Sequence, residues 1–577
     1  MNKKMKMKTK MKCHFSKSAF ALPFLFFSFF SGVSQAADLS QSLQALPVQD
    51  GGRLKPFDSF ARESLQLIYG KQEFKAENSN GAARPATEIV MTWMLQPAAW
   101  QETPLFEIKY ALLKKALKLP EEKKYLSFSE LSSNERLPTV MQELQSKRET
   151  KEKLDPYFQS LQRLENQIFT FREIASGHML RLVPPPKLQD KPSETWISLA
   201  DLKPELQEKF LDVTKAFIQV LGVSTAETSI EKSKEAEMAL GNAVARFKQA
   251  AKAENSELYP SETQMNAELH YNHFHPFKWA WIVYLLAAIS CFLAWILGRH
   301  IFYTLAWELT AVGFLIHIYG FALRVYLTGR PPVSNMYETV VWVAFGVVLF
   351  SMIIEYLYRW RFVLLAGALV GAFCLALADM APLILDPSLQ PLEPVLRNNF
   401  WLLIHVLTIT ISYAAFFLAF ALGDIGLIYF LKGESENKEK IKAITLATYR
   451  SIQIGVALLT PGIILGGVWA DYSWGRFWGW DPKETWALIV LLGYLAVLHG
   501  RLVGLLRDFG MIVASVISFT TVIMAWYGVN FILGAGLHSY GFGAGGVEYV
   551  AVFVAIHLLF VIFTSVIRFG RLKNPKV

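Results

Sequence analysis

The sequence predicts an all-α polytopic membrane protein with about nine transmembrane helices, preceded by an N-terminal, mainly helical extracytoplasmic domain. Three observations predict this class. The 577 residues are 53% hydrophobic and only 18% charged, which is too apolar for an ordinary soluble protein. Apolar stretches of bilayer length recur from about residue 279 to the end of the chain. A polar region lies before them, and a secretory signal pattern lies before that region.

Residues 1–36 have the pattern of a cleaved signal peptide. Lys3 to Lys17 form a basic region, Phe20 to Phe30 an apolar core, and Ser34-Gln35-Ala36 a small-x-small cleavage site. The apolar run is shorter than the roughly 20 residues that a spanning helix needs. We therefore expect cleavage rather than a first transmembrane helix, and we expect the domain that follows to lie outside the cytoplasm.

Residues 37–275 contain no stretch that could span a membrane. Helical periodicity at 106–119, 161–174 and 202–220 predicts a mainly helical domain. The charged segments 147–153 and 224–237 predict solvated faces or linkers. His178 stands alone in this region, so we interpret it as a surface residue, and we find no catalytic constellation here.

Residues 276–577 form the predicted membrane domain. Its apolar spans lie at about 279–297, 301–322, 339–357, 362–385, 400–431, 452–468, 486–503, 511–533 and 547–567. With the first domain outside, nine crossings place the C-terminus in the cytoplasm. Fourteen Lys and Arg residues then flank the cytoplasmic ends and six flank the outer ends, as the positive-inside rule requires. This asymmetry also accounts for the net charge of +9, so nucleic acid is not an expected partner, whereas membrane lipid is.

The three cysteines are Cys13, Cys291 and Cys374. No pair has CxxC spacing, and the last two lie in apolar spans. The spacing excludes a dithiol oxidoreductase, a protein that holds its own c-type haem, and a disulfide framework.

Residues 466–486 form an aromatic segment between the sixth and seventh spans, on the predicted outer face. Five tryptophans fall within eighteen residues: Trp469, Trp474, Trp478, Trp480 and Trp486. An interfacial belt explains one or two such rings, whereas planar rings on a glycine-rich turn suit a large flat apolar ligand. Haem is the obvious candidate. Asp471, Asp481 and Glu484 add acidic groups, and Arg476 and Lys483 are candidates either for propionate contacts or for anchoring at the interface.

Two histidines are predicted at the same outer face. His405 lies one turn inside the fifth span, and His538 lies in the loop after the eighth. Either one alone favours a local hydrogen bond, but the two beside an aromatic segment favour a bis-histidine axial pair for haem iron.

His499 is predicted roughly 20 Å deeper, thirteen residues into the seventh span. Intramembrane ionisable residues indicate function by default, so His499 predicts a second haem position near the cytoplasm. His317 lies at the wrong depth to be its partner and His300 at an interface, so we expect the partner ligand in another subunit.

Residues 329–338 predict an outer loop followed by a helix start. Arg330 in this loop could hold ligand carboxylates or equally a lipid phosphate. For Glu308, Asp379 and Asp424, which lie in or near spans, we expect snorkelling or structural pairing.

Together, the segment from Trp469-Ala470-Asp471 to Trp486 resembles the WWD signature of a haem-handling protein family. The subtype that it resembles is the CcsA (ResC) subunit of system II cytochrome c maturation, which is also the C-terminal half of fused CcsBA synthases. The resemblance extends to residues 332–338, to His405, to His499-Gly500-Arg501 and to residues 536–541. It covers about residues 279–567, and residues 48–56 add a weaker match.

The resemblance implies that His405 and His538 are the external haem ligands, that His499 is the intramembrane ligand, and that the tryptophan segment holds haem b. It implies delivery of reduced haem to the CxxCH motif of apocytochrome c and formation of two thioether bonds. It further implies a bacterial cytoplasmic (inner) membrane, a periplasmic N-terminal domain and a thioredoxin-like, thiol-reducing partner. The predicted signal and polar domain stand where a fused synthase carries its CcsB (ResB) portion, so we expect a separate CcsB-like subunit.

Three other functions remain open from the sequence. The chain could be a haem exporter or chaperone without ligation activity, with attachment left to a partner. It could be an electron-transfer subunit with bis-histidine haem, although such subunits place their haems between helices inside the bilayer. A transporter without cofactor would leave the aromatic segment unexplained.

Overall fold

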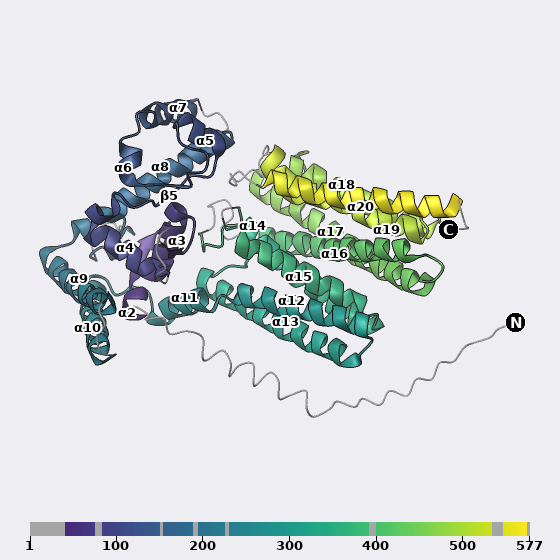
Figure 1. Cartoon of the computed structure of the whole chain (residues 1–577), viewed down its shortest axis with the longest axis horizontal. Coiled ribbons are helices and arrows are strands. Elements are labelled where there is room, and N and C mark those ends of the chain that lie inside the picture. The colour runs from purple at the N-terminus through teal and green to yellow at the C-terminus, as the bar shows by residue number, and fades with distance from the viewer. Residues whose placement is uncertain are drawn as a thin grey trace. The chain divides into compact units, whose positions relative to one another are not determined.

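The computed structural model describes residues 41–75, 83–150, 154–187, 194–225, 230–382, 384–391, 400–533 and 546–573. The predicted signal peptide lies outside these ranges. Within them, the N-terminal region combines helices with short strands, and the C-terminal half is a bundle of long helices (Figure 1). The predicted all-α membrane class with its helical N-terminal domain is therefore confirmed, with small sheets added to that domain.

The helices of the N-terminal region bury apolar faces against one another. Their bounds are α2 Gln41–Gln44, α3 Phe57–Tyr69, α4 Ala86–Leu95, η3 Pro97–Trp100, α5 Ala111–Ala116, α6 Phe128–Ser132, α7 Leu137–Glu149, α8 Pro156–Ala175, η4 Leu199–Asp201, α9 Pro204–Thr225, α10 Ile230–Glu254 and α11 Glu262–Phe274. Trp93, Phe106 and Phe171 are almost fully buried at the centre, and Phe171 meets the other two rings edge-on at 5.5 and 5.6 Å.

Four short strands form an antiparallel sheet in the order β2-β1-β7-β8, and two two-stranded sheets accompany it. The strands are β1 Pro47–Asp50, β2 Arg53–Pro56, β3 Glu73–Phe74, β4 Arg84–Pro85, β5 Phe106–Glu107, β6 Tyr125–Leu126, β7 Arg181–Val183 and β8 Ile197–Ser198. The helix predicted from the periodicity at 106–119 is thus wrong for its first residues, because Phe106 and Glu107 form a strand that pairs with β6. The β1–β2 turn needs positive φ at both central residues, and Gly51 and Gly52 supply it with φ of 58° and 78°.

A chain of charged and polar side chains ties β2 and α3 to α11, the helix that leads into the first span. Arg53 donates to both carboxylate oxygens of Glu268 at 2.8 and 2.9 Å. Ser59 donates to Glu268 at 2.6 Å, and Asn272 donates to Ser59 at 2.8 Å and to Asp58 at 3.0 Å. Buried charges are stable only when paired in this way.

Nine helices in the described part of the chain are long and apolar enough to cross a membrane, which confirms the predicted number. They are α12 Pro276–Leu297, whose span continues from α11, α13 His300–Thr328, α14 Met336–Tyr358, α15 Phe362–Met380, α16 Phe400–Lys432, α17 Lys438–Trp474, α18 Pro482–Leu502, α19 Asp508–Ile523 with the π-helical η6 Met524–Leu533, and α20 Val547–Lys573. The predicted apolar span 452–468 lies inside α17, which begins fourteen residues earlier, at Lys438, because its polar first turns are helical too.

Helices α16 and α17 pack against each other at glycines. A Cβ at Gly455 would lie 2.4 Å from the Phe416 ring, and one at Gly462 would lie 3.2 Å from the Ile409 backbone. Only a residue without a side chain permits this approach, which is typical of helix pairs in membranes.

Polar side-chain pairs link neighbouring helices of the bundle. His557 of α20 lies 3.4 Å from Asp424 of α16, and Arg568, further along α20, lies 3.0 Å from Glu434 in the loop after α16. Asp379 accepts from the Trp281 indole at 3.2 Å. Asp379 and Asp424 therefore have the structural partners that we expected from the sequence.

Candidate functional site: an aromatic cavity around His405

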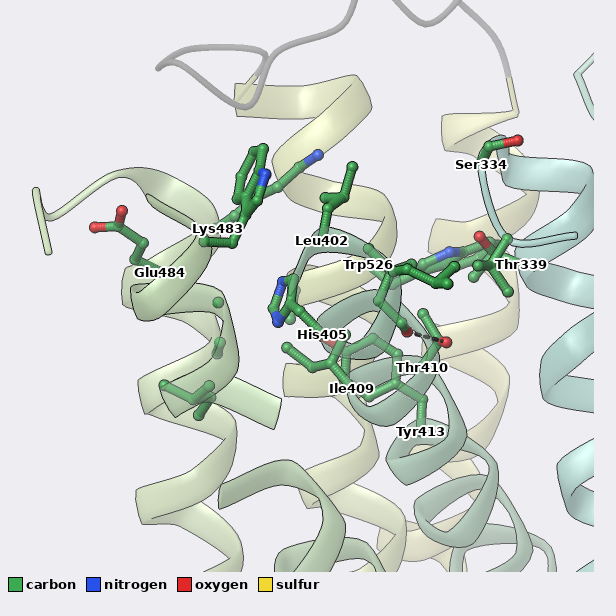
Figure 2. Close-up of a pocket in the computed structure, with 18 of the residues that line it drawn as sticks. Ser334, Thr339, Leu402, His405, Ile409, Thr410, Tyr413, Lys483, Glu484 and Trp526 are labelled. Atoms are coloured by element: carbon green, nitrogen blue, oxygen red, sulfur yellow. Dashed lines mark hydrogen bonds between the residues drawn. The ribbon is translucent and has the colours of Figure 1, made fainter. Parts of the chain in front are cut away.

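A cavity of about 260 Å³ lies at one end of the bundle. Six segments line it: the loop before α14 with the first turn of that helix, the start of α16, the end of α17, the connection between α17 and α18, the start of α18, and η6. We call this end, which also holds the α17–α18 connection, the tryptophan end. Figure 2 shows His405 near the middle of the lining residues, with Lys483 and Glu484 on one side and Ser334, Thr339 and Trp526 on the other.

The His405 ring is oriented by α17. Its Nδ1 atom lies 2.7 Å from the Gly462 carbonyl oxygen. A carbonyl oxygen only accepts, so Nδ1 carries the proton and the Nε2 atom has the lone pair that a metal needs. Histidine ligands in metal sites are held in the same manner through their second nitrogen.

Gly466 makes room for this ring one turn further along α17. A Cβ on Gly466 would lie 2.6 Å from His405 Cε1 and 2.8 Å from Nδ1. Both glycines belong to the predicted sixth span 452–468, and the structure agrees. Both lie inside α17, where Gly466 faces the imidazole and Gly467 faces the Phe477 ring.

The five predicted tryptophans divide between the cavity and its surroundings. Trp469 and Trp478 line the cavity together with Phe477. Trp474 supports Trp469 from behind, edge-on, with ring centroids 4.7 Å apart. Trp480 is 70% exposed, and Trp486 lies on α18 beside the apolar core.

The connection between α17 and α18 is only residues 475–481. Gly475 ends α17 in the left-handed conformation, with φ of 67°, and Trp480 also has a positive φ, of 57°. A non-glycine residue in that region is strained and persists only where the surroundings impose it. The positive φ of Trp480 lets the chain enter α18 directly at Asp481.

Asp481 and Glu484 start α18 as a capping box. The Asp481 side chain accepts from the Lys483 amide at 2.9 Å, and Glu484 accepts from the amides of Gly479 and Asp481 at 2.7 and 3.2 Å. Arg476 lies 3.8 Å from the second Glu484 oxygen and over the Trp474 ring. Arg476 and Asp481 thus build the connection and do not line the cavity, whereas Lys483 does.

The sequence did not predict several of the lining residues. Thr410 and Tyr413 follow His405 on α16, and Trp526 and Asn530 come from η6. A tryptophan and an asparagine inside an apolar span were the features of η6 that could have indicated a role in the site. Its π-helical conformation is typical of functional segments but is not visible in the sequence.

The other predicted histidines do not join His405 in the described structure. His499 lies near the opposite end of α18, is exposed on the outside of the bundle and bonds to the Leu495 carbonyl at 2.7 Å. His538 lies outside the described residues. His317 is fully buried and bonds to the Tyr284 hydroxyl at 3.2 Å.

Residues 333–538 match the model of the family described as "Cytochrome C assembly protein". The chain is 34% identical over 265 residues to the cytochrome c biogenesis protein CcsA of Parasynechococcus marenigrum, which covers 41% of this chain and 86% of that relative. It is 33% identical over 239 residues to the CcsA protein of Guillardia theta, covering 37% and 78%. The chain belongs to the CcsA family. The family assignment that the tryptophan segment and histidines predicted is thereby confirmed, and with it a role in cytochrome c biogenesis.

This CcsA-family chain also resembles a longer protein. It is 30% identical over 530 residues to protein NrfI of Wolinella succinogenes, which covers 88% of the chain but only 55% of NrfI. That match extends into the region before the membrane helices. Among solved structures, a cytochrome c haem lyase CcmF matches with a TM-score of 0.37 and 16% identity over 51% of this chain and 50% of that one, a likeness too distant to inform the mechanism.

Proposed function

We propose that this CcsA-family chain holds haem at the tryptophan end and presents it for covalent attachment to the CxxCH motif of apocytochrome c. One observation carries the proposal: an imidazole oriented through Nδ1 lies in a cavity walled by Trp469, Phe477 and Trp478. His405 supplies one axial ligand. The resemblance assigns the other to His538.

The chemistry needs positioning more than acid or base catalysis. The thioether bonds form between the haem vinyl groups and two cysteine thiols of the partner motif, so the chain must hold ferrous iron, exclude water and leave the vinyl edge accessible. A porphyrin held at His405 would have to keep its vinyl edge accessible to an apocytochrome.

Charge asymmetry supports the orientation. With nine spans and the basic residues on the cytoplasmic side, the tryptophan end faces the periplasm, together with the N-terminal domain. The protein then belongs in a bacterial inner membrane, and its C-terminus lies in the cytoplasm.

His499 supports a second haem position near the other end of the bundle. Its imidazole faces outward, so a second ligand would come from a partner in the membrane. A CcsB-like subunit fits this requirement, and a thioredoxin-like protein would keep the apocytochrome thiols reduced. On this proposal the chain is one subunit of a cytochrome c synthase, and export of haem without ligation is the alternative function.

Reconstitution tests the proposal. The full chain, purified with and without a CcsB-like partner, is mixed with an apocytochrome that carries one CxxCH motif, and covalent haem is measured. We expect a reduced low-spin haem spectrum on the chain and thioether-bound haem only with the partner. Haem on the chain without product would favour the exporter, and absence of haem from every preparation would refute the proposal.

A further inference from the structure

Two basic side chains line the cavity, Arg330 and Lys483. They come from different elements, since Arg330 precedes α14 and Lys483 lies in the first turn of α18. We call the part of the lining at the start of α18 the Lys483 end, and the part formed by the loop before α14 the Arg330 end. A ligand in this cavity therefore has a basic group available on each of two segments that are far apart in the chain.

The charges at the Lys483 end cancel. Lys483 and Arg476 are the cations of the α17–α18 connection, and Asp481 and Glu484 are the anions beside them. Both carboxylates are engaged in the capping box, and Glu484 also faces Arg476. This end offers a ligand no net charge.

The charges at the Arg330 end do not cancel. Arg324 and Arg330 share a single carboxylate, Glu338: Arg324 lies 2.9 Å from one oxygen and Arg330 lies 3.1 Å from the other. Glu338 and Arg324 are each 1% exposed and Arg330 is 11% exposed. Among the described residues, two guanidinium groups against one carboxylate leave one positive charge, and Arg330 is the member that reaches the cavity.

Glu338 is held away from any ligand by further donors. The Ser334 amide and hydroxyl both donate to its Oε2 atom, at 2.9 and 2.6 Å. Arg324 is likewise engaged by the Tyr271 hydroxyl and by the carbonyls of Pro387 and Ser388. Arg330 donates to the Gln390 carbonyl at 2.7 Å. In the described part of the chain, Glu338 and Gln390 are the acceptors recorded for its side chain, and a guanidinium has five N–H donors.

The start of α14 adds to the positive potential at the Arg330 end of the cavity. Asn335 caps this helix by accepting from the Glu338 amide at 2.8 Å, and Met336 and Thr339 of the first turn line the cavity. The positive end of the helix dipole therefore lies at the same end of the cavity as Arg330.

We propose that the Arg330 end of the cavity binds the carboxylates of the ligand, the two propionates if that ligand is haem. The inference rests on the proposed function and adds an orientation to it. Arg330 recognises carboxylate through its planar N–H donors, and the buried Arg324–Glu338 pair positions it and leaves it uncompensated. Lys483 does not bind the carboxylates, because it belongs to the part of the lining whose charges cancel.

The test compares haem with haem dimethyl ester, in which both propionates are neutral. Haem is removed from the purified full chain, which is then titrated with each compound in the same detergent. The ratio of the two Kd values is measured for four proteins: the parent, Arg330→Gln, Arg330→Lys and Lys483→Gln. A charge-assisted bond in a partly buried site corresponds to roughly a 10- to 100-fold preference. We expect the parent to prefer haem by that factor, Arg330→Gln to lose the preference, Arg330→Lys to keep part of it, and Lys483→Gln to keep it fully.

The outcomes separate the two proposals. If the parent binds both compounds equally, or if Lys483→Gln rather than Arg330→Gln removes the preference, the orientation is wrong although haem binding stands. If the parent binds neither compound, the proposed function itself fails. Arg330→Gln must bind the ester as tightly as the parent does, which shows that the cavity is intact; a loss of affinity for both compounds would overturn the assignment of a carboxylate site.

Discussion

The Nδ1 atom of His405 and the carbonyl oxygen of Gly462 are 2.7 Å apart, on two different helices. The contact exists because α16 and α17 approach closely at Gly462, where any Cβ would lie 3.2 Å from the Ile409 backbone. The same close approach places Gly466 under the imidazole. One small-residue face of α17 thus sets both the helix spacing and the direction of the candidate ligand.

Gly466→Ala is expected to displace the His405 ring, because its Cβ would lie 2.6 Å from Cε1. Changes in groups that orient a metal ligand typically cost 10- to 100-fold in affinity, so we expect haem affinity to fall by roughly that factor. The measurement is the low-spin haem spectrum of the purified chain. Gly493→Ala is the matched control, since nothing lies within 4 Å of a Cβ there; equal losses in both variants would contradict this role of Gly466.

His405→Ala and His499→Ala should differ in effect. The two residues lie toward opposite ends of the bundle, so each substitution should leave the surroundings of the other intact. We expect His405→Ala to abolish the low-spin spectrum of haem at the tryptophan end, and His499→Ala to lower the amount of haem while leaving the spectrum of the remainder unchanged. An altered spectrum in His499→Ala, measured on the reduced protein, would argue against two separate positions.

Asp481→Ala should destabilise the start of α18 by about 1 kcal/mol, the usual contribution of an N-cap. Asp481 is 5% exposed and accepts from the Lys483 amide. Thermal unfolding in detergent measures the loss, and Asp481→Asn should retain most of the stability because asparagine also caps helices. A stable Asp481→Ala variant would show that Glu484 alone suffices.

Asp424→Ala should weaken the attachment of α20 to α16, because it removes the partner that lies 3.4 Å from His557. Polar pairs between membrane helices contribute about 0.6 kcal/mol on average and up to about 1.7. We expect a loss in that range by thermal unfolding, with His557→Ala adding little on top of Asp424→Ala. Additive losses would show that the two side chains act independently.

The sequence by itself determined the membrane class, the number of spans and the family, because apolar length, tryptophan density and isolated histidines are local properties of the chain. From the same properties, the sequence predicted that His405, Trp469 and Trp478 lie at the same end of the bundle, as they do in the structure. It also flagged Arg330 and Lys483 with alternatives for each.

Only the tertiary structure decided which of these residues share one cavity. The sequence could not show that Arg476 turns to Glu484, that Trp480 points outward, or that Trp526 and Asn530 enter from a later helix, because these depend on how helices far apart in the chain pack. The role of Gly466 also came only from the tertiary structure. The sequence places this glycine in the sixth span, but it does not show that the missing side chain lets the imidazole of a neighbouring helix lie against the backbone.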